Sequence, residues 1–194
     1  GDLSIREANF DGLGQSTLRF GGQIRGLPDL DRLAVAIRLD ALSSTRDDLT
    51  RLLPDSLWPT TLTLPDHISL RGNLSGSLNE QLRVDALLTT SLGDVTLKGD
   101  ISHPTLPDKI RYTGTVGLRE FDLGTFLQKP PHEVGTLSLL AEVGGTGTDP
   151  AAMQAQWKAK VQAVQLYGYT YHDLMSEGAL RQGKLSMKAG IADP

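Results

Sequence analysis

The sequence predicts an all-β protein made of amphipathic strands, and three observations indicate this class. Apolar and polar residues alternate over most of the 194-residue chain, which is typical of strands with one apolar and one polar face. Short turns rich in Gly, Ser, Asn and Asp separate these runs. Aromatic residues make up only 5% of the chain, so any buried surface must consist mainly of Leu, Val, Ile and Ala.

Residues 68–101 carry the clearest alternation. Their apolar residues, together with several glycines, occupy every second position. The same alternation resumes after a turn at Gly93-Asp94. The same pattern predicts strands at residues 18–26 and 33–39, and Leu3 and Phe10 indicate one more strand ahead of these. We therefore expect neighbouring strands whose apolar side chains lie on one face.

A short helix is predicted near residues 45–53, because Leu49, Leu52 and Leu53 fall on one helical face behind a polar cap. It could brace the sheet, or it could cap or gate one end of an open sheet. Residues 54–65 contain three prolines and predict a rigid connector.

The next strand is expected at residues 110–118. Its parity slips by one residue at Glu120, which predicts a β-bulge. Residues 124–127 indicate a helical turn, and residues 137–145 restore the alternation.

Residues 153–163 combine good helix formers with a nearly perfect period of two. Propensity alone favours a helix after Asp149-Pro150, whereas the alternation favours a strand, and we predict the strand. Two further strands are expected at residues 167–171 and 185–191.

Three of these strand pairs can be aligned as an irregular internal repeat. The first strands of the three copies begin at Leu18, Ile68 and Leu137. The second strands begin at Leu33, Leu82 and Met153.

Composition excludes several function classes. The net charge of -4 and the pI near 5.5 come without a Lys/Arg stripe, so nucleic acid is not an expected partner. The absence of cysteine excludes disulfides and thiol chemistry. No apolar run approaches the roughly 20 residues that a membrane-spanning helix needs.

No motif predicts catalysis. Residues 144–147 form the one glycine-rich candidate for a phosphate loop, but they lack the nucleotide-binding spacing and are interpreted as a turn. The four histidines show no metal-ligand spacing, and they are His67, His103, His132 and His172. We therefore predict no catalytic residue, no cofactor and no metal, and a protein that is not an enzyme.

Tyr167, Tyr169 and Tyr171 alternate near the C-terminal end of the chain. Such a row either stacks on sugars or stabilises cross-strand packing, and the packing interpretation is the more ordinary one.

The segments LTLPDHISLRGNLSG and LSLLAEVGGTGTDP, and the later run LYGYTYHDLMSEGALRQGKLSMKAGIADP, carry a family resemblance. With the repeated strand pairs, they resemble the periplasmic region of the TamB family. This family belongs to the AsmA-like bridge-like lipid-transfer proteins of Gram-negative bacteria, and the chain is most similar to the Bacteroidota versions. The resemblance covers essentially the whole chain, and its motifs are strand repeats without an invariant catalytic residue.

The resemblance implies an elongated β-taco, a half-pipe of strands with an apolar concave face. It also implies that residues 1–194 are a single β-rich segment of a much longer periplasmic protein, anchored in the inner membrane. Phospholipid, neighbouring segments of the same chain and an outer-membrane barrel protein of the TamA type are the implied partners, in a translocation and assembly module for outer-membrane biogenesis.

Two hypotheses follow for the apolar faces. Periodicity alone favours a closed sandwich or barrel, which would make this a structural or adhesive module with possible glycan binding. The resemblance favours a non-enzymatic lipid conduit with a hydrophobic groove that binds acyl chains. The expected groove-lining residues are Ile68, Leu70, Leu74, Leu82, Val84, Ala86, Leu88, Val95, Leu97, Ile101, Ile110, Tyr112, Val116, Leu118, Met153, Trp157 and Val161.

Overall fold

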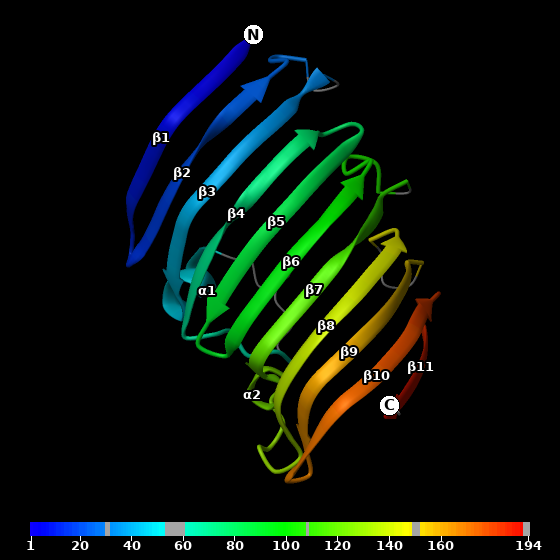
Figure 1. Ribbon diagram of the computed structural model, residues 1–194. Helices are drawn as coiled ribbons and strands as arrows, with labels where there is room; N and C mark the ends of the chain where they lie inside the picture. Colours follow the sequence, from blue (N-terminus) through cyan, green and yellow to red (C-terminus); the bar gives the residue numbers. More distant parts are fainter. Residues whose placement is uncertain (30–31, 53–60, 108, 149–151, 192–194) are drawn as a thin grey trace.

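The computed structural model describes residues 1–29, 32–52, 61–107, 109–148 and 152–191. Eleven antiparallel strands form one sheet in which every strand lies beside its neighbours in sequence (Figure 1). The strands are β1 (Asp2–Leu13), β2 (Ser16–Arg25), β3 (Ala34–Thr45), β4 (His67–Ser77), β5 (Gln81–Thr90), β6 (Gly93–Ser102), β7 (Arg111–Asp122), β8 (Val134–Thr146), β9 (Gln154–Leu166), β10 (Tyr169–Arg181) and β11 (Lys184–Ile191). Two short helices, α1 (Arg46–Leu52) and α2 (Leu123–Phe126), complete the described fold.

The sheet is open, as expected for a half-pipe, and does not close into a barrel or pair with a second sheet. Its accessible surface is 12981 Å². A compact monomer of 20.9 kDa would expose about 9000 Å² by the usual scaling with mass. Among the described side chains, none is fully buried. One face of the sheet therefore remains uncovered over much of its length.

The helices lie along one margin of the sheet, where the strands turn (Figure 1). Residues 63–66 lie along this margin, where the Thr63 N–H donates to the Phe126 carbonyl at 2.8 Å. The Asp66 N–H then donates to the Ser91 hydroxyl at 2.8 Å. We call this margin the helical rim. The expected helix at residues 45–53 is confirmed for residues 46–52, and residues 53–60 of the expected helix end and connector lie outside the described residues.

Bulges bend several strands close to the helical rim. The register of β7 against β8 shifts between Leu118 and Phe121, and Glu120 has a φ of 48°. The bulge predicted from the parity slip is therefore confirmed. Similar shifts occur between Leu39 and Leu42 in β3. Because a bulge bends its strand and increases its twist, these positions curl the rim relative to the rest of the sheet.

Other local expectations can be compared directly with the strands. Residues 154–166 form a strand, as the alternation predicted against helix propensity. The turn expected at residues 144–147 is wrong for its first three residues, because Gly144, Gly145 and Thr146 still belong to β8. The sheet register sets Leu18 in line with Leu70 and Leu139, which are two residues beyond the starts of the second and third aligned copies.

Candidate functional site: an apolar groove

The register of the eleven strands arranges apolar side chains in four rows that cross the whole sheet. Each row follows residues that are direct cross-strand partners, so all its members lie on one face.

Row A contains Phe10, Leu18, Leu42, Leu70, Leu88, Val95, Leu118, Leu139, Val161 and Leu174, and its last backbone position in the register is residue 191. Row B contains Ala8, Phe20, Leu39, Gly72, Ala86, Leu97, Val116, Ala141, Ala159, Ser176 and Ala189. Row C contains Ile5, Gly22, Ile37, Leu74, Val84, Gly99, Gly114, Val143, Trp157, Gly178 and Met187. Row D contains Leu3, Ile24, Val35, Gly76, Leu82, Ile101, Tyr112, Gly145, Ala155, Leu180 and Leu185.

These rows contain no charged residue. Polar side-chain atoms occur in Tyr112, Trp157 and Ser176 alone. Most row members are half-buried, whereas Ala141, Ala159 and a few others are buried between larger neighbours. We refer to the surface formed by rows A to D as the apolar groove.

The rows include every sequence-predicted lining residue except three. Ile68 continues the same parity one step beyond row A, where its partner is Thr90. Ile110 and Met153 immediately precede β7 and β9 and lie outside the strands. Apart from Ile110 and Met153, the residues of the sequence list therefore lie on one face of the sheet.

The expected list omitted the groove residues of β1, β2, β3, β8, β10 and β11. Their alternation is the signal that could have found them, because it is the same as in the residues that were listed. The register adds them as full members of the rows. In β8 the added residues are Leu139, Ala141, Val143 and Gly145.

The helical rim closes one margin of the groove with a small packed cluster. Leu92 and Phe121 are buried there, and Phe126 of α2 packs edge-on against Phe121 with ring centroids 5.3 Å apart. The Asp122 carboxylate caps α2 by accepting a hydrogen bond from the Thr125 N–H at 2.9 Å. The helical rim is therefore a packed margin of the sheet, whereas the face beside it is open.

A buried carboxylate ties α1 to the turn between β1 and β2. Asp48 is 5% exposed and accepts hydrogen bonds from the Gln15 N–H at 2.8 Å and the Ser16 hydroxyl at 2.9 Å. Burial alone would raise the pKa of Asp48. The hydrogen bonds from Gln15, Ser16 and Thr45, with the charge of Arg51, nevertheless hold that pKa below its ordinary value.

Replacing Asp48 by Asn is expected to lower the free energy of unfolding at pH 7. Because the folded-state pKa lies below the unfolded one, this stabilisation is present above about pH 4 and is lost as the pH falls through the folded pKa. Urea unfolding of both proteins should therefore show a difference at neutral pH that shrinks in acid. Asp47→Asn, at the exposed neighbouring position, is the control. Equal differences at both pH values would contradict the prediction.

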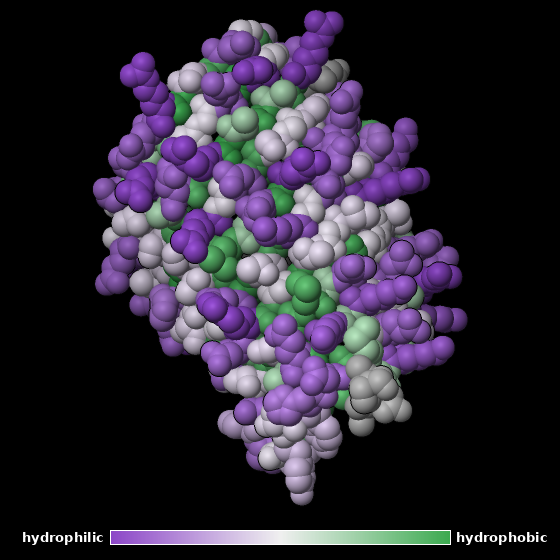
Figure 2. Space-filling view, in the orientation of Figure 1, coloured by the Kyte–Doolittle hydropathy of each residue, from purple (hydrophilic) through white to green (hydrophobic). Residues whose placement is uncertain are grey.

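The opposite face of the sheet is polar, and hydrophilic side chains predominate on the near face in Figure 2. Three ion pairs there join direct cross-strand partners. They are Arg83 with Asp100, Lys98 with Asp85, and Arg119 with Asp94. Since these pairs are on or near the surface, they favour the register of the sheet more than its stability.

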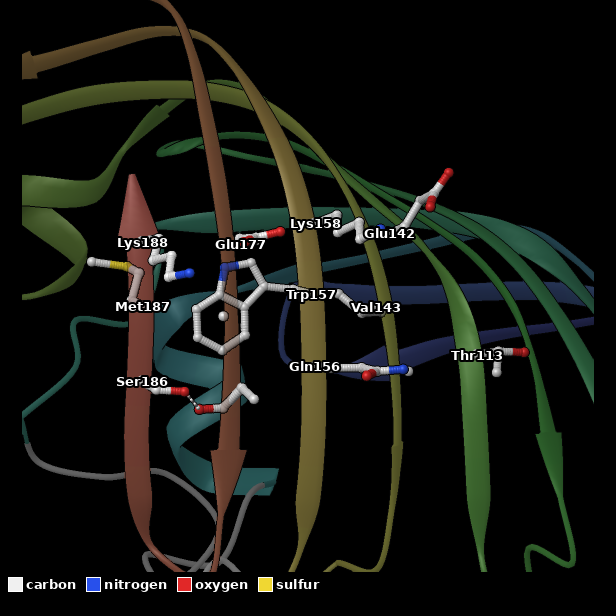
Figure 3. A pocket seen from close by; sticks show the side chains of 13 residues that line it. Thr113, Glu142, Val143, Gln156, Trp157, Lys158, Glu177, Ser186, Met187 and Lys188 are labelled. Atoms are coloured by element: carbon white, nitrogen blue, oxygen red, sulfur yellow. Dashed lines mark hydrogen bonds between the residues drawn. The ribbon is translucent and has the colours of Figure 1, made fainter. Parts of the chain in front are cut away.

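A hollow of about 710 Å³ lies over β8 to β11 and reaches Thr113 of β7 (Figure 3). Its lining follows triplets along the strands, such as Glu142–Gly144 and Gln156–Lys158. In each triplet, the first and third residues lie at strand positions of the polar face. The middle residue belongs to row C. The hollow therefore overlaps the apolar groove, with which it shares Val143, Trp157, Gly178 and Met187 of row C.

The three alternating tyrosines lie at the tip of the hairpin between β9 and β10. Tyr167 is in the turn and 74% exposed, and Tyr169 and Tyr171 are also exposed. Among the described residues, no His, Cys, Asp or Glu cluster could hold a metal ion. Within the same residues, no helix is long and apolar enough to cross a membrane.

Comparison of the chain with protein-family models, with curated proteins and with solved structures gives no match.

Proposed function

We propose that this chain is a segment of a lipid conduit that binds phospholipid acyl chains in the apolar groove. The observation that carries the proposal is the set of four uncharged rows, which run without interruption across eleven strands of an open sheet. A face of this kind must be covered by something apolar, since leaving it in water costs free energy in proportion to its area.

The dimensions of the groove suit an extended chain. Four rows along the strands span about 20 Å, and eleven strands span about 50 Å across the sheet. An acyl chain requires no polar partner, so the lack of charges in rows A to D suits it. A second copy of the protein could also cover the face, and the experiment below distinguishes the two.

Uniformity along the rows supports movement as well as binding. Row A is aliphatic from Leu18 to Leu174, so no position offers a polar anchor that would hold a ligand more tightly than its neighbours. A chain sliding across the strands would meet nearly the same surface at each step. We therefore propose transport along the sheet, with lipid head groups left in water at the open margin.

The family resemblance supplies the larger setting of this proposal. A TamB-type role would place the segment in the periplasm, within a parent protein anchored in the inner membrane. Its partners would be phospholipid, adjoining segments of the same chain and an outer-membrane barrel of the TamA type, and transport would serve outer-membrane biogenesis.

Site-specific photo-crosslinking tests the proposal. A photoreactive amino acid at Val84 or Leu97 faces the groove, whereas one at Arg83 or Thr96 faces the polar side. In cells supplied with labelled phospholipid precursor, the first pair should capture lipid and the second should not. Equal lipid labelling from both faces of the sheet would contradict the proposed binding of lipid to the apolar groove. Adducts between two protein chains at Val84, without lipid, would assign the face to self-association instead.

A second candidate function rests on the exposed tyrosines. Tyr167, Tyr169 and Tyr171 expose aromatic rings at one hairpin tip, which is a surface that sugars stack on. A structural or adhesive module would bind a glycan there, and replacing all three tyrosines by serine would remove that binding without affecting lipid capture at Val84.

A further inference from the structure

Two aromatic side chains of the groove lie across glycines on the next strand. Tyr112 of β7 is the direct partner of Gly145 in β8, and Trp157 of β9 is the direct partner of Gly178 in β10. A Cβ built on Gly178 would lie 2.1 Å from Trp157 Cζ2, and one built on Gly145 would lie 2.6 Å from Tyr112 Cζ. Each ring thus occupies the space that a partner side chain would fill.

The Trp157 indole contacts β10 at two places. Its six-membered ring covers Gly178, and its Nε1–H donates to the Ser176 hydroxyl at 3.5 Å. Because these two residues are adjacent members of rows C and B on one strand, the indole lies along β10 and does not stand away from the sheet. Figure 3 shows it extending from β9 toward β10.

This orientation decides whether the groove is passable near its C-terminal end. Trp157 has the largest side chain in the four rows, and an upright indole would obstruct a ligand that moves across the strands. Lying on Gly178, the Trp157 side chain is half-buried and still partly accessible. Row C also carries no side chain on β6 and β7, because its members there are Gly99 and Gly114, which are direct cross-strand partners.

We propose that Trp157 is the residue that a bound acyl chain contacts over β9 and β10, and that Gly178 positions its ring. The inference rests on the proposed function, because the acyl chain is the ligand of that same groove. Gly145 has the corresponding positioning role for Tyr112.

Fluorescence quenching tests the contact directly. The chain contains two tryptophans, so Trp58→Phe leaves Trp157 as the single emitter. Dibromostearate should quench Trp157 emission saturably, because bromine quenches indoles at contact distance, and stearate should compete with it. In the same assay, a fluorescent fatty acid should bind Trp157→Ala about tenfold more weakly, and Trp157→Phe should recover most of the affinity.

Glycine variants test the positioning role. Gly178→Ala should lift the indole, shift its emission to longer wavelength and reduce quenching by dibromostearate. Gly190→Ala in β11 is the matched control, because a Cβ there would meet nothing within 4 Å. Since a Cβ at Gly178 would also lie 2.6 Å from the Ser186 carbonyl, circular dichroism must confirm folding. If Gly178→Ala is unfolded, the Trp157→Ala affinity decides the question.

The two proposals fail in different ways. If the crosslinker at Val84 captures lipid while Trp157 is not quenched and Trp157→Ala binds normally, the role of Trp157 is wrong and the groove function stands. If Val84 captures no lipid, the groove function itself is wrong.

Discussion

Leu97→Asp is expected to abolish acyl-chain binding while lowering the free energy of unfolding by only about 1–2 kcal/mol. Leu97 lies in row B at the middle of the groove and is 42% exposed, so an introduced carboxylate would still reach water. A ligand chain crossing β6 would however have to pass a charge in an otherwise uncharged row. Binding of a fluorescent fatty acid and urea unfolding measure the two effects separately.

Val161→Asp is the matched comparison for this experiment. Val161 belongs to row A but is only 8% exposed, so its replacement buries a charge without a partner and should cost about 3 kcal/mol or more. A closed core would predict comparable, severe destabilisation at both positions. A mild effect at Leu97 with a severe one at Val161 is the result expected of an open face. Severe unfolding by Leu97→Asp would contradict the open groove.

Gly93→Ala is expected to lower the free energy of unfolding by about 2–4 kcal/mol. Gly93 begins β6 with a φ of 132°, a conformation that side chains disfavour. An added Cβ would lie 2.6 Å from the Phe121 Cα and 2.8 Å from the Glu120 carbonyl, and neither backbone atom can rotate away. Denaturant unfolding measures the loss.

The control for Gly93→Ala is again Gly190→Ala, whose Cβ would meet open space. A change of no more than a few tenths of a kcal/mol is expected there. Comparable losses in both variants would show that the close approach at the β7 bulge is not what makes glycine necessary at position 93.

Much of the fold could be predicted from local pattern. Period-two alternation identified the strands, including residues 154–166, where helix propensity pointed the other way. The parity slip at Glu120 identified a bulge. Both features are recorded in neighbouring residues, because successive side chains of a strand point to opposite faces. The register across the sheet could not be predicted in this way, because it depends on turn lengths and bulges in several strands, which no single run reveals.

The candidate site was predictable in part for the same reason. Val84, Leu97 and Val116 were expected on one face, and the register places them there. The Asp48 contacts with Gln15 and Ser16 join residues more than 30 positions apart, so sequence reasoning assigned Asp48 no such role. The contact between Trp157 and Gly178 likewise depends on the register of β9 against β10, which decides the residue that lies opposite Trp157.

By itself, the sequence determined that this is an all-β chain whose strands share one apolar face, since that information is local and repeats every two residues. The tertiary structure decided whether that face would be sealed. Closure depends on twist, bulges and helix placement summed over eleven strands, and here they leave the sheet open with one built rim. For this reason the same alternation that permits a closed sandwich has here produced an open sheet with an apolar face.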